Sequence, residues 1–126
     1  MMTDTVHTPA SCTASIMAVQ DALYVLNGKW KIPLIVALLN GPQRFKDIQQ
    51  SLKVITPKVL SKELRDLELN DFVFRKVYDT VPVMITYELT AYSSTLNPII
   101  DSLRDWGVKH KQRIVEVRKL EMSMEG

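Results

Sequence analysis

The stretch ITPKVLSKELRDLELND, residues 55–71, decides the fold. Its leucines recur three and four residues apart, which is the spacing of the inward face of a helix. These positions are Leu60, Leu64 and Leu67. Thr56 is a favourable N-cap residue, and proline is well tolerated in the first turn that follows it. The sequence therefore predicts a helix from Pro57 to about Leu69.

The opposite side of this predicted helix carries a stripe of polar and cationic side chains. The stripe consists of Lys58, Ser61, Lys62 and Arg65. The segment from Lys29 to Lys62 holds seven basic residues and one acid, a net charge of +6 in a chain whose formal total is +2. Such local asymmetry favours an anionic partner for this segment. The alternative is that the lysines only solvate an ordinary helix surface.

Three further helices are expected before this stretch, each from apolar residues at helical spacing. They cover Ala14–Leu26, Trp30–Leu39 and Arg44–Leu52. In the first of them the periodicity predicts an inward face made of Ile16, Val19, Leu23 and Leu26.

The chain after residue 71 changes character. Alternating residues predict two strands, Phe72–Tyr78 and Val83–Leu89, joined by a turn at residues 79–82. A last helix is expected over Leu96–Leu120, with an apolar stripe that includes Leu103 and Trp106. The order of elements predicts an α+β, mostly α fold of the winged helix-turn-helix type.

In a helix-turn-helix the second helix enters the major groove, and the first crosses the DNA backbone. Here the second helix would be the one that carries the cationic stripe. Ser61 and Arg65 have side chains suited to base edges, whereas Lys58 and Lys62 suit phosphates. The free amides at a helix start also attract phosphate, which adds Thr56 to the candidate DNA-binding residues.

At this point the sequence resembles the HxlR-type bacterial transcription regulators, relatives of the MarR group. The resemblance covers about Cys12 to His110 and rests on ordered motifs that include "LNGKWKIPLI", "GPQRFKDI", "ITPKVLSKELRDLE" and "VYDTVP". It implies a homodimeric winged-helix protein that binds a double-stranded DNA operator to repress or activate genes, with no effector identified. We expect one DNA-binding and dimerisation domain at residues 12–120, a flexible arm at 1–11 and a flexible tail at 121–126.

The wing departs from the family pattern, which commonly places arginine or lysine after the wing-tip proline. Here Pro82 is followed by three apolar residues. The resemblance thus implies weaker or apolar contact of the wing with DNA and leaves Arg75 and Lys76 to approach phosphates from the base of the wing. Arg44 and Lys46 open the preceding helix and are further candidates for backbone contact, although Phe45 between them suits the core.

Cys12 is the single cysteine of the chain, so an internal disulfide is excluded. The resemblance implies a candidate sensor of oxidants or electrophiles here, because some family members sense them through an N-terminal cysteine. Reversible switching would then need an intersubunit disulfide, a sulfenic acid or a small-thiol cap. The alternative is a small apolar residue packed under the arm.

The first and last helices are the candidate dimer interface. Two half-sites about one helical turn apart require two recognition helices, and a symmetric dimer supplies them. The residues expected at the interface are Ile16, Leu23, Leu103, Trp106 and Ile114.

Other classes of function find little support. No triad, metal-ligand spacing or glycine-rich phosphate loop is present in the sequence, so we expect neither an enzyme nor a cofactor. The apolar run IPLIVALL is eight residues long, short of the about 20 that cross a bilayer. The N-terminus lacks the basic region of a signal peptide, so we expect a cytoplasmic protein. The rival hypothesis is a winged domain that binds protein instead of DNA, but interfaces between proteins are depleted of lysine.

Overall fold

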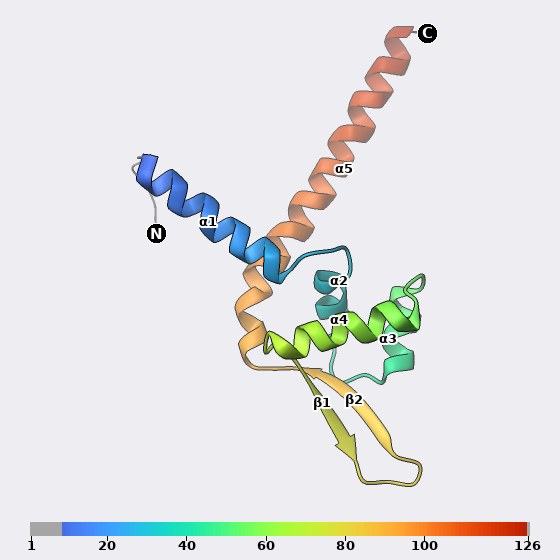
Figure 1. Ribbon diagram of the computed structural model, residues 1–126. Helices are drawn as coiled ribbons and strands as arrows, with labels where there is room; N and C mark the ends of the chain where they lie inside the picture. The colour runs from blue at the N-terminus through green and yellow to red at the C-terminus, as the bar shows by residue number, and fades with distance from the viewer. Residues whose placement is uncertain (1–8, 126) are drawn as a thin grey trace.

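The computed structural model describes residues 9–125 (Figure 1). Its elements are α1 (Pro9–Val25), α2 (Lys31–Leu38), α3 (Phe45–Leu52), α4 (Pro57–Leu69), β1 (Val73–Tyr78), β2 (Met84–Leu89), the short 3₁₀ helix η1 (Tyr92–Leu96) and α5 (Asn97–Glu125). This order confirms the predicted winged helix-turn-helix.

The helix predicted from residues 55–71 is confirmed with the expected bounds. Thr56 caps α4, because its hydroxyl oxygen accepts a hydrogen bond from the amide of Val59 at 3.2 Å. The preceding helix, α3, starts one residue later than predicted, and Arg44 takes the N-cap position. The amide of Arg44 donates to the carboxylate of Asp47 at 3.3 Å, which satisfies one free donor at this helix start.

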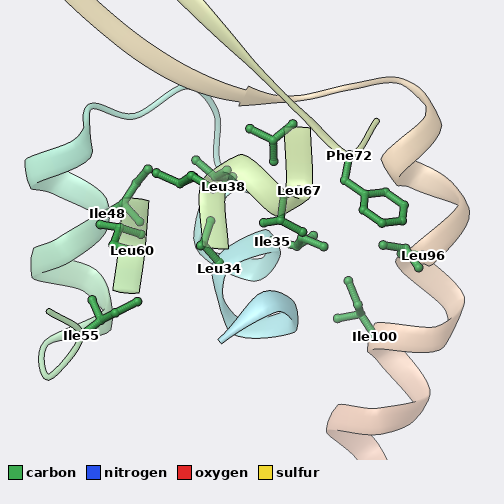
Figure 2. Close-up of a cluster of buried hydrophobic side chains, with 12 residues drawn as sticks. Leu34, Ile35, Leu38, Ile48, Ile55, Leu60, Leu67, Phe72, Leu96 and Ile100 are labelled. Atoms are coloured by element: carbon green, nitrogen blue, oxygen red, sulfur yellow. The ribbon is translucent and has the colours of Figure 1, made fainter. Parts of the chain in front are cut away.

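The core forms where α2, α3 and α4 meet the start of the wing and the start of α5 (Figure 2). Each of these elements contributes apolar side chains that are almost fully buried. They are Leu34, Ile35, Leu38, Ile48, Ile55, Leu60, Leu64, Leu67, Phe72, Val73, Leu96 and Ile100. The inward face predicted for α4 is therefore confirmed, and its burial fixes which side of α4 remains free.

The wing is an antiparallel hairpin that extends beyond this core (Figure 1). Its register runs from Val73 opposite Leu89 to Tyr78 opposite Met84. Gln43, just before α3, forms an isolated antiparallel β-bridge with Tyr87 of β2. The backbone amide of Gln43 donates to the carbonyl of Tyr87 at 3.0 Å, and the amide of Tyr87 donates to the carbonyl of Gln43 at 2.8 Å. This bridge holds the wing against the start of the helix-turn-helix.

The two terminal helices are longer than predicted. The first begins at Pro9 instead of Ala14, because a proline is well placed in a first turn. The last reaches Glu125, and η1 takes the residues just before it. Residues 9–11 and 121–125, predicted as arm and tail, are helical, whereas residues 1–8 and 126 lie outside the described part of the chain.

The prediction of an inward face on the first helix is wrong for the single chain. Ile16, Val19 and Leu23 are more than half exposed, and α1 buries no residue. Figure 1 shows why: α1 and α5 project away from the winged body instead of lying along it. Among residues 9–125, no helix is both long and apolar enough to span a membrane.

Candidate nucleic-acid interface

The outer side of α4 is free of contacts with the core. Lys58, Ser61, Lys62 and Arg65 are all exposed, as is Thr56 at the helix start. The three leucines on the opposite side are at most 1% exposed. The packing of α4 therefore holds a polar, cationic stripe outward, although contact of that stripe with DNA remains a prediction.

Arg65 meets the base of the wing. A hollow of about 210 Å³ lies between α4 and the hairpin, lined by Ser61, Leu64, Arg65, Glu68, Arg75 and Tyr87. Arg75 is opposite Tyr87 in the hairpin register, so both project from the same face. Two guanidinium groups from separate elements thus border one hollow, beside a single carboxylate.

Tyr87 was not predicted as a site residue. Burial raises the pKa of its phenol, Glu68 adds to that effect, and Arg75 opposes it. The phenol therefore stays neutral at physiological pH and is available as a hydrogen-bond donor at the edge of the hollow. The alternation of β2 indicated on which face Tyr87 lies, but it did not indicate that α4 would cover that face.

Lys76 does not share this hollow. Neighbouring residues of a strand point to opposite faces, and Lys76 is opposite Thr86 on the other side of the hairpin. Its ammonium lies 5.2 Å from the centre of the Tyr78 ring, a cation–π contact. Arg75 and Lys76 are both exposed, but the structure does not bring them together on one surface.

Arg44 lies beside the tip of the wing. It borders a hollow of about 370 Å³ whose other walls are residues 80–85. Lys46, two residues on, is exposed as well, and Phe45 between them packs against the core as the sequence indicated. The start of α3 therefore lies beside the tip of the wing.

The net charge of the segment overstated its free positive charge, because Lys31 is buried. Lys31 is one of the seven basic residues counted in the segment from Lys29 to Lys62, yet it is only 3% exposed. Its ammonium lies 2.6 Å from Glu63 and 3.2 Å from Asp66, both on α4. Lys29 remains exposed, with its ammonium 5.0 Å from the centre of the Trp30 ring.

The contacts of Lys31 shift its own pKa and the pKa of Asp66. Burial by itself would lower the pKa of Lys31, but hydrogen bonds to Glu63 and Asp66 outweigh it, and the pKa is raised. The pKa of Asp66 is lowered, chiefly by its hydrogen bond with Lys62 and further by Lys31. Lys31 and Asp66 are therefore both charged at neutral pH.

Cys12 lies within the first turn of α1 rather than before a helix, and it is exposed. Packing of Cys12 as a small apolar residue is thus not seen in the single chain. Of the residues predicted at the dimer interface, Ile16, Leu23, Leu103 and Trp106 are more than half exposed, and Ile114 is half-buried. The Trp106 ring stacks on His110 with their centres 4.7 Å apart.

Residues 25–115 match the family described as HxlR-like helix-turn-helix. The chain belongs to this family. It is 38% identical over 96 residues to the uncharacterized HTH-type transcriptional regulator YdeP of Bacillus subtilis, a match that covers 76% of this chain and 75% of YdeP. Within residues 9–125 no group of three His, Cys, Asp or Glu side chains is placed to hold a metal.

Two solved structures extend the comparison. The redox regulator HypR in its reduced form superimposes with a TM-score of 0.71 at 35% identity, over 75% of this chain and 93% of HypR. The reduced form of the transcriptional regulator YodB from B. subtilis gives 0.65 at 29% identity, over 80% of this chain and 91% of that chain. The family and these named relatives are helix-turn-helix regulators rather than enzymes.

Proposed function

We propose that this protein is a transcription regulator of the bacterial cytoplasm that binds a double-stranded DNA operator as a homodimer. The observation that carries the proposal is the division of α4 into a fully packed leucine side and a free cationic side. A helix of this kind fits the width of the major groove of B-DNA. Membership of the HxlR-like family and the regulators among its relatives support the same function.

Within this proposal α4 reads the bases. Ser61 lies in the exposed stripe and Arg65 lies at its C-terminal end, where Arg65 can contact guanine with two hydrogen bonds. Lys58 at the other end of the stripe and Lys62 between Ser61 and Arg65 bind phosphates. The first amides of α4, next to Thr56, add a phosphate site through the helix dipole.

The elements around α4 position the protein on the backbone. Arg75 and Tyr87 border the hollow beside α4. In this proposal the Arg75 guanidinium and the Tyr87 hydroxyl bind a DNA phosphate at the edge of the major groove. Arg44 and Lys46 reach the backbone from the start of α3, and Lys76 reaches it from the outer face of the wing. Contacts of this kind fix register without reading sequence.

The terminal helices support the homodimer. Most apolar side chains of α1 and α5 are exposed in the single chain, and a helix that exposes such a stripe normally buries it against another element. A second copy supplies that element and also a second α4, as a palindromic operator requires.

The experiment is a fluorescence-anisotropy titration of a labelled random-sequence duplex at increasing salt. We expect binding at low salt. The logarithm of the association constant should fall linearly with the logarithm of the salt concentration, because neutralised phosphates release counterions. Failure of the native protein to bind any duplex would overturn the proposal and favour the alternative, a winged module that binds protein.

Selection from a random duplex pool then supplies a preferred sequence for a test of Arg65. Arg65→Ala should weaken binding to that sequence by about 1–3 kcal/mol and relax the preference at one base position. Lys62→Ala should weaken all sequences alike. Arg118→Ala, an exposed arginine near the far end of α5, is the matched control and should change neither quantity.

Cys12 supports a second proposal, that the regulator responds to oxidants. The thiol is exposed, and HypR, a relative of known structure, is a redox regulator. Peroxide would oxidise the thiol to a sulfenic acid with release of one water, and condensation with Cys12 of a second copy would release another water and form a disulfide. Mild peroxide should change DNA affinity in the native protein and leave Cys12→Ser unaffected. Unchanged affinity in both proteins would overturn this proposal.

A further inference from the structure

A buried cation joins α2 to the inner edge of α4. The Lys31 ammonium donates hydrogen bonds to Glu63 at 2.6 Å, to Asp66 at 3.2 Å and to the side-chain oxygen of Asn27 at 3.1 Å. The side chains of Lys31 and Glu63 are 4% and 9% exposed. Three acceptors thus satisfy the three donors of one ammonium in a place that water hardly reaches.

Asp66 belongs both to this buried group and to the surface. Its Oδ2 accepts from Lys31 on the inner side and from Lys62 on the outer side, the latter at 3.1 Å. The Asp66 side chain is 32% exposed, whereas that of Lys62 is 66% exposed. One carboxylate oxygen therefore lies between a cation fixed in the core and a cation of the proposed DNA-binding stripe.

We propose that Lys31 is a positioning residue for the DNA interface: it neutralises Asp66 from the buried side, so that Lys62 is free to leave Asp66 for a DNA phosphate. The inference rests on the proposed function. Lys31 itself does not contact DNA in this inference, but it affects how strongly the exposed stripe of α4 binds DNA.

The physical reason is the cost of an unpaired, partly buried carboxylate. Transfer of Lys62 to a phosphate removes one of the two cations that Asp66 contacts. With Lys31 in place, Asp66 keeps a charge-assisted hydrogen bond throughout the transfer. Without Lys31, Asp66 would be left with no cation, would hold Lys62 more tightly and would repel the incoming phosphate.

A double-mutant cycle tests this role. Lys31→Met/Glu63→Met replaces the buried ion pair by apolar side chains of similar length, which leaves the net charge unchanged and keeps the core filled. Asp66→Asn removes the carboxylate that Lys31 is proposed to neutralise. The four proteins of the cycle are the native chain, the Met pair, Asp66→Asn and the triple variant, each titrated with the same labelled random-sequence duplex at low salt.

We expect the Met pair to weaken duplex binding about tenfold, because Lys62 then stays with Asp66 and its contact with a DNA phosphate is lost. Asp66→Asn should strengthen binding a few fold, because Lys62 is released for that contact. In the Asp66→Asn background the Met pair should change affinity by less than about twofold, because no carboxylate remains to be neutralised. An equal loss in both backgrounds would overturn the inference and leave Lys31 with a role in packing alone.

The titration of Asp66 gives a readout that packing would not move. In the Met pair, carbon NMR of the Asp66 carboxyl should show a pKa higher than in the native protein, because one of its two cations is gone. An unchanged pKa would overturn the inference even if DNA affinity fell. A native protein that binds no duplex would overturn the proposed function and this inference together, whereas an additive cycle with intact native binding overturns the inference alone.

Discussion

The winged body, residues 31–96, and the two terminal helices expose surfaces of opposite character. In the winged body the inward side chains of α2, α3 and α4 are buried, and the opposite side of α4 is mainly polar and cationic. In α1 no residue is buried, and in the 29 residues of α5 only Ile100 is buried. The exposed stripes on these helices are apolar, with Leu23 63% and Trp106 64% exposed.

The difference supports the two partners of the proposed function, DNA and a second copy of the chain. A packed body that exposes lysine and arginine lacks nothing for folding, so its cationic stripe is available for an anion such as DNA. Long helices with exposed leucine and tryptophan still lack a surface to pack against, which the second copy of the proposed homodimer would provide. The predictions below each test one side of this contrast.

The largest effect is expected inside the winged body, at Lys31. Lys31→Met leaves Glu63 as an uncompensated buried carboxylate and should lower the free energy of unfolding by about 3–5 kcal/mol. Urea denaturation measures this loss. Lys31→Met/Glu63→Met should recover most of it, and a double variant no more stable than the single one would contradict the importance of the ion pair.

A core truncation on the same helix should cost nearly as much. Leu60→Ala removes a side chain that is fully buried, and should lower the free energy of unfolding by about 2–5 kcal/mol. Leu69→Ala is the matched control, because Leu69 is 78% exposed at the end of α4, and its cost should stay within about 0.5 kcal/mol. Similar costs for the two variants would mean that α4 is not divided into a packed and a free side.

The terminal helices should respond in association rather than in folding of the winged body. Trp106→Ala should weaken the proposed dimer by about 2 kcal/mol or more. Trp106 is exposed in the single chain, and a tryptophan that becomes buried at an interface often carries much of the binding energy. Sedimentation equilibrium measures the dissociation constant, with Met124→Ala near the end of α5 as control. A native chain that remains monomeric at high concentration would show that these helices have another partner.

The smallest effect is a pH dependence. The pKa of Asp66 is lowered from its usual 3.8 by Lys62 and Lys31, so its contribution to stability is present above that value and is lost as pH falls through the folded pKa. The raised pKa of Lys31 acts at the other end, where stability is lost as pH rises beyond its usual 10.5. Thermal unfolding from pH 5 downward should be less acid-sensitive in Asp66→Asn than in the native protein, and equal sensitivity would contradict the pairing.

The sequence was sufficient for those parts of the fold that local patterns determine. The leucine period and the Thr56 cap predicted α4 with its bounds, and the alternation of residues 83–89 predicted the second strand of the wing. The same period in α1 predicted an inward face that the single chain does not form, because periodicity shows that a stripe is apolar but not what covers it.

The candidate site was predictable in its exposed stripe and not in its supports. A count of charges treated Lys31 as one more surface lysine, since no local pattern shows that Glu63, 32 residues further on, lies within hydrogen-bond distance. The hollow that Arg65 and Arg75 border could not be predicted for the same reason, because α4 and β1 come together only through tertiary packing.

The most direct test of the division between the two regions is an NMR titration of the isotope-labelled full chain with the selected duplex. If α4 is the DNA-reading surface, backbone amide shifts should change at Ser61, Lys62 and Arg65, and at Arg75 beside them, while those around Leu23 and Trp106 keep their positions. Shifts that change along α1 and α5 while α4 stays silent would contradict the assignment of α4 to DNA.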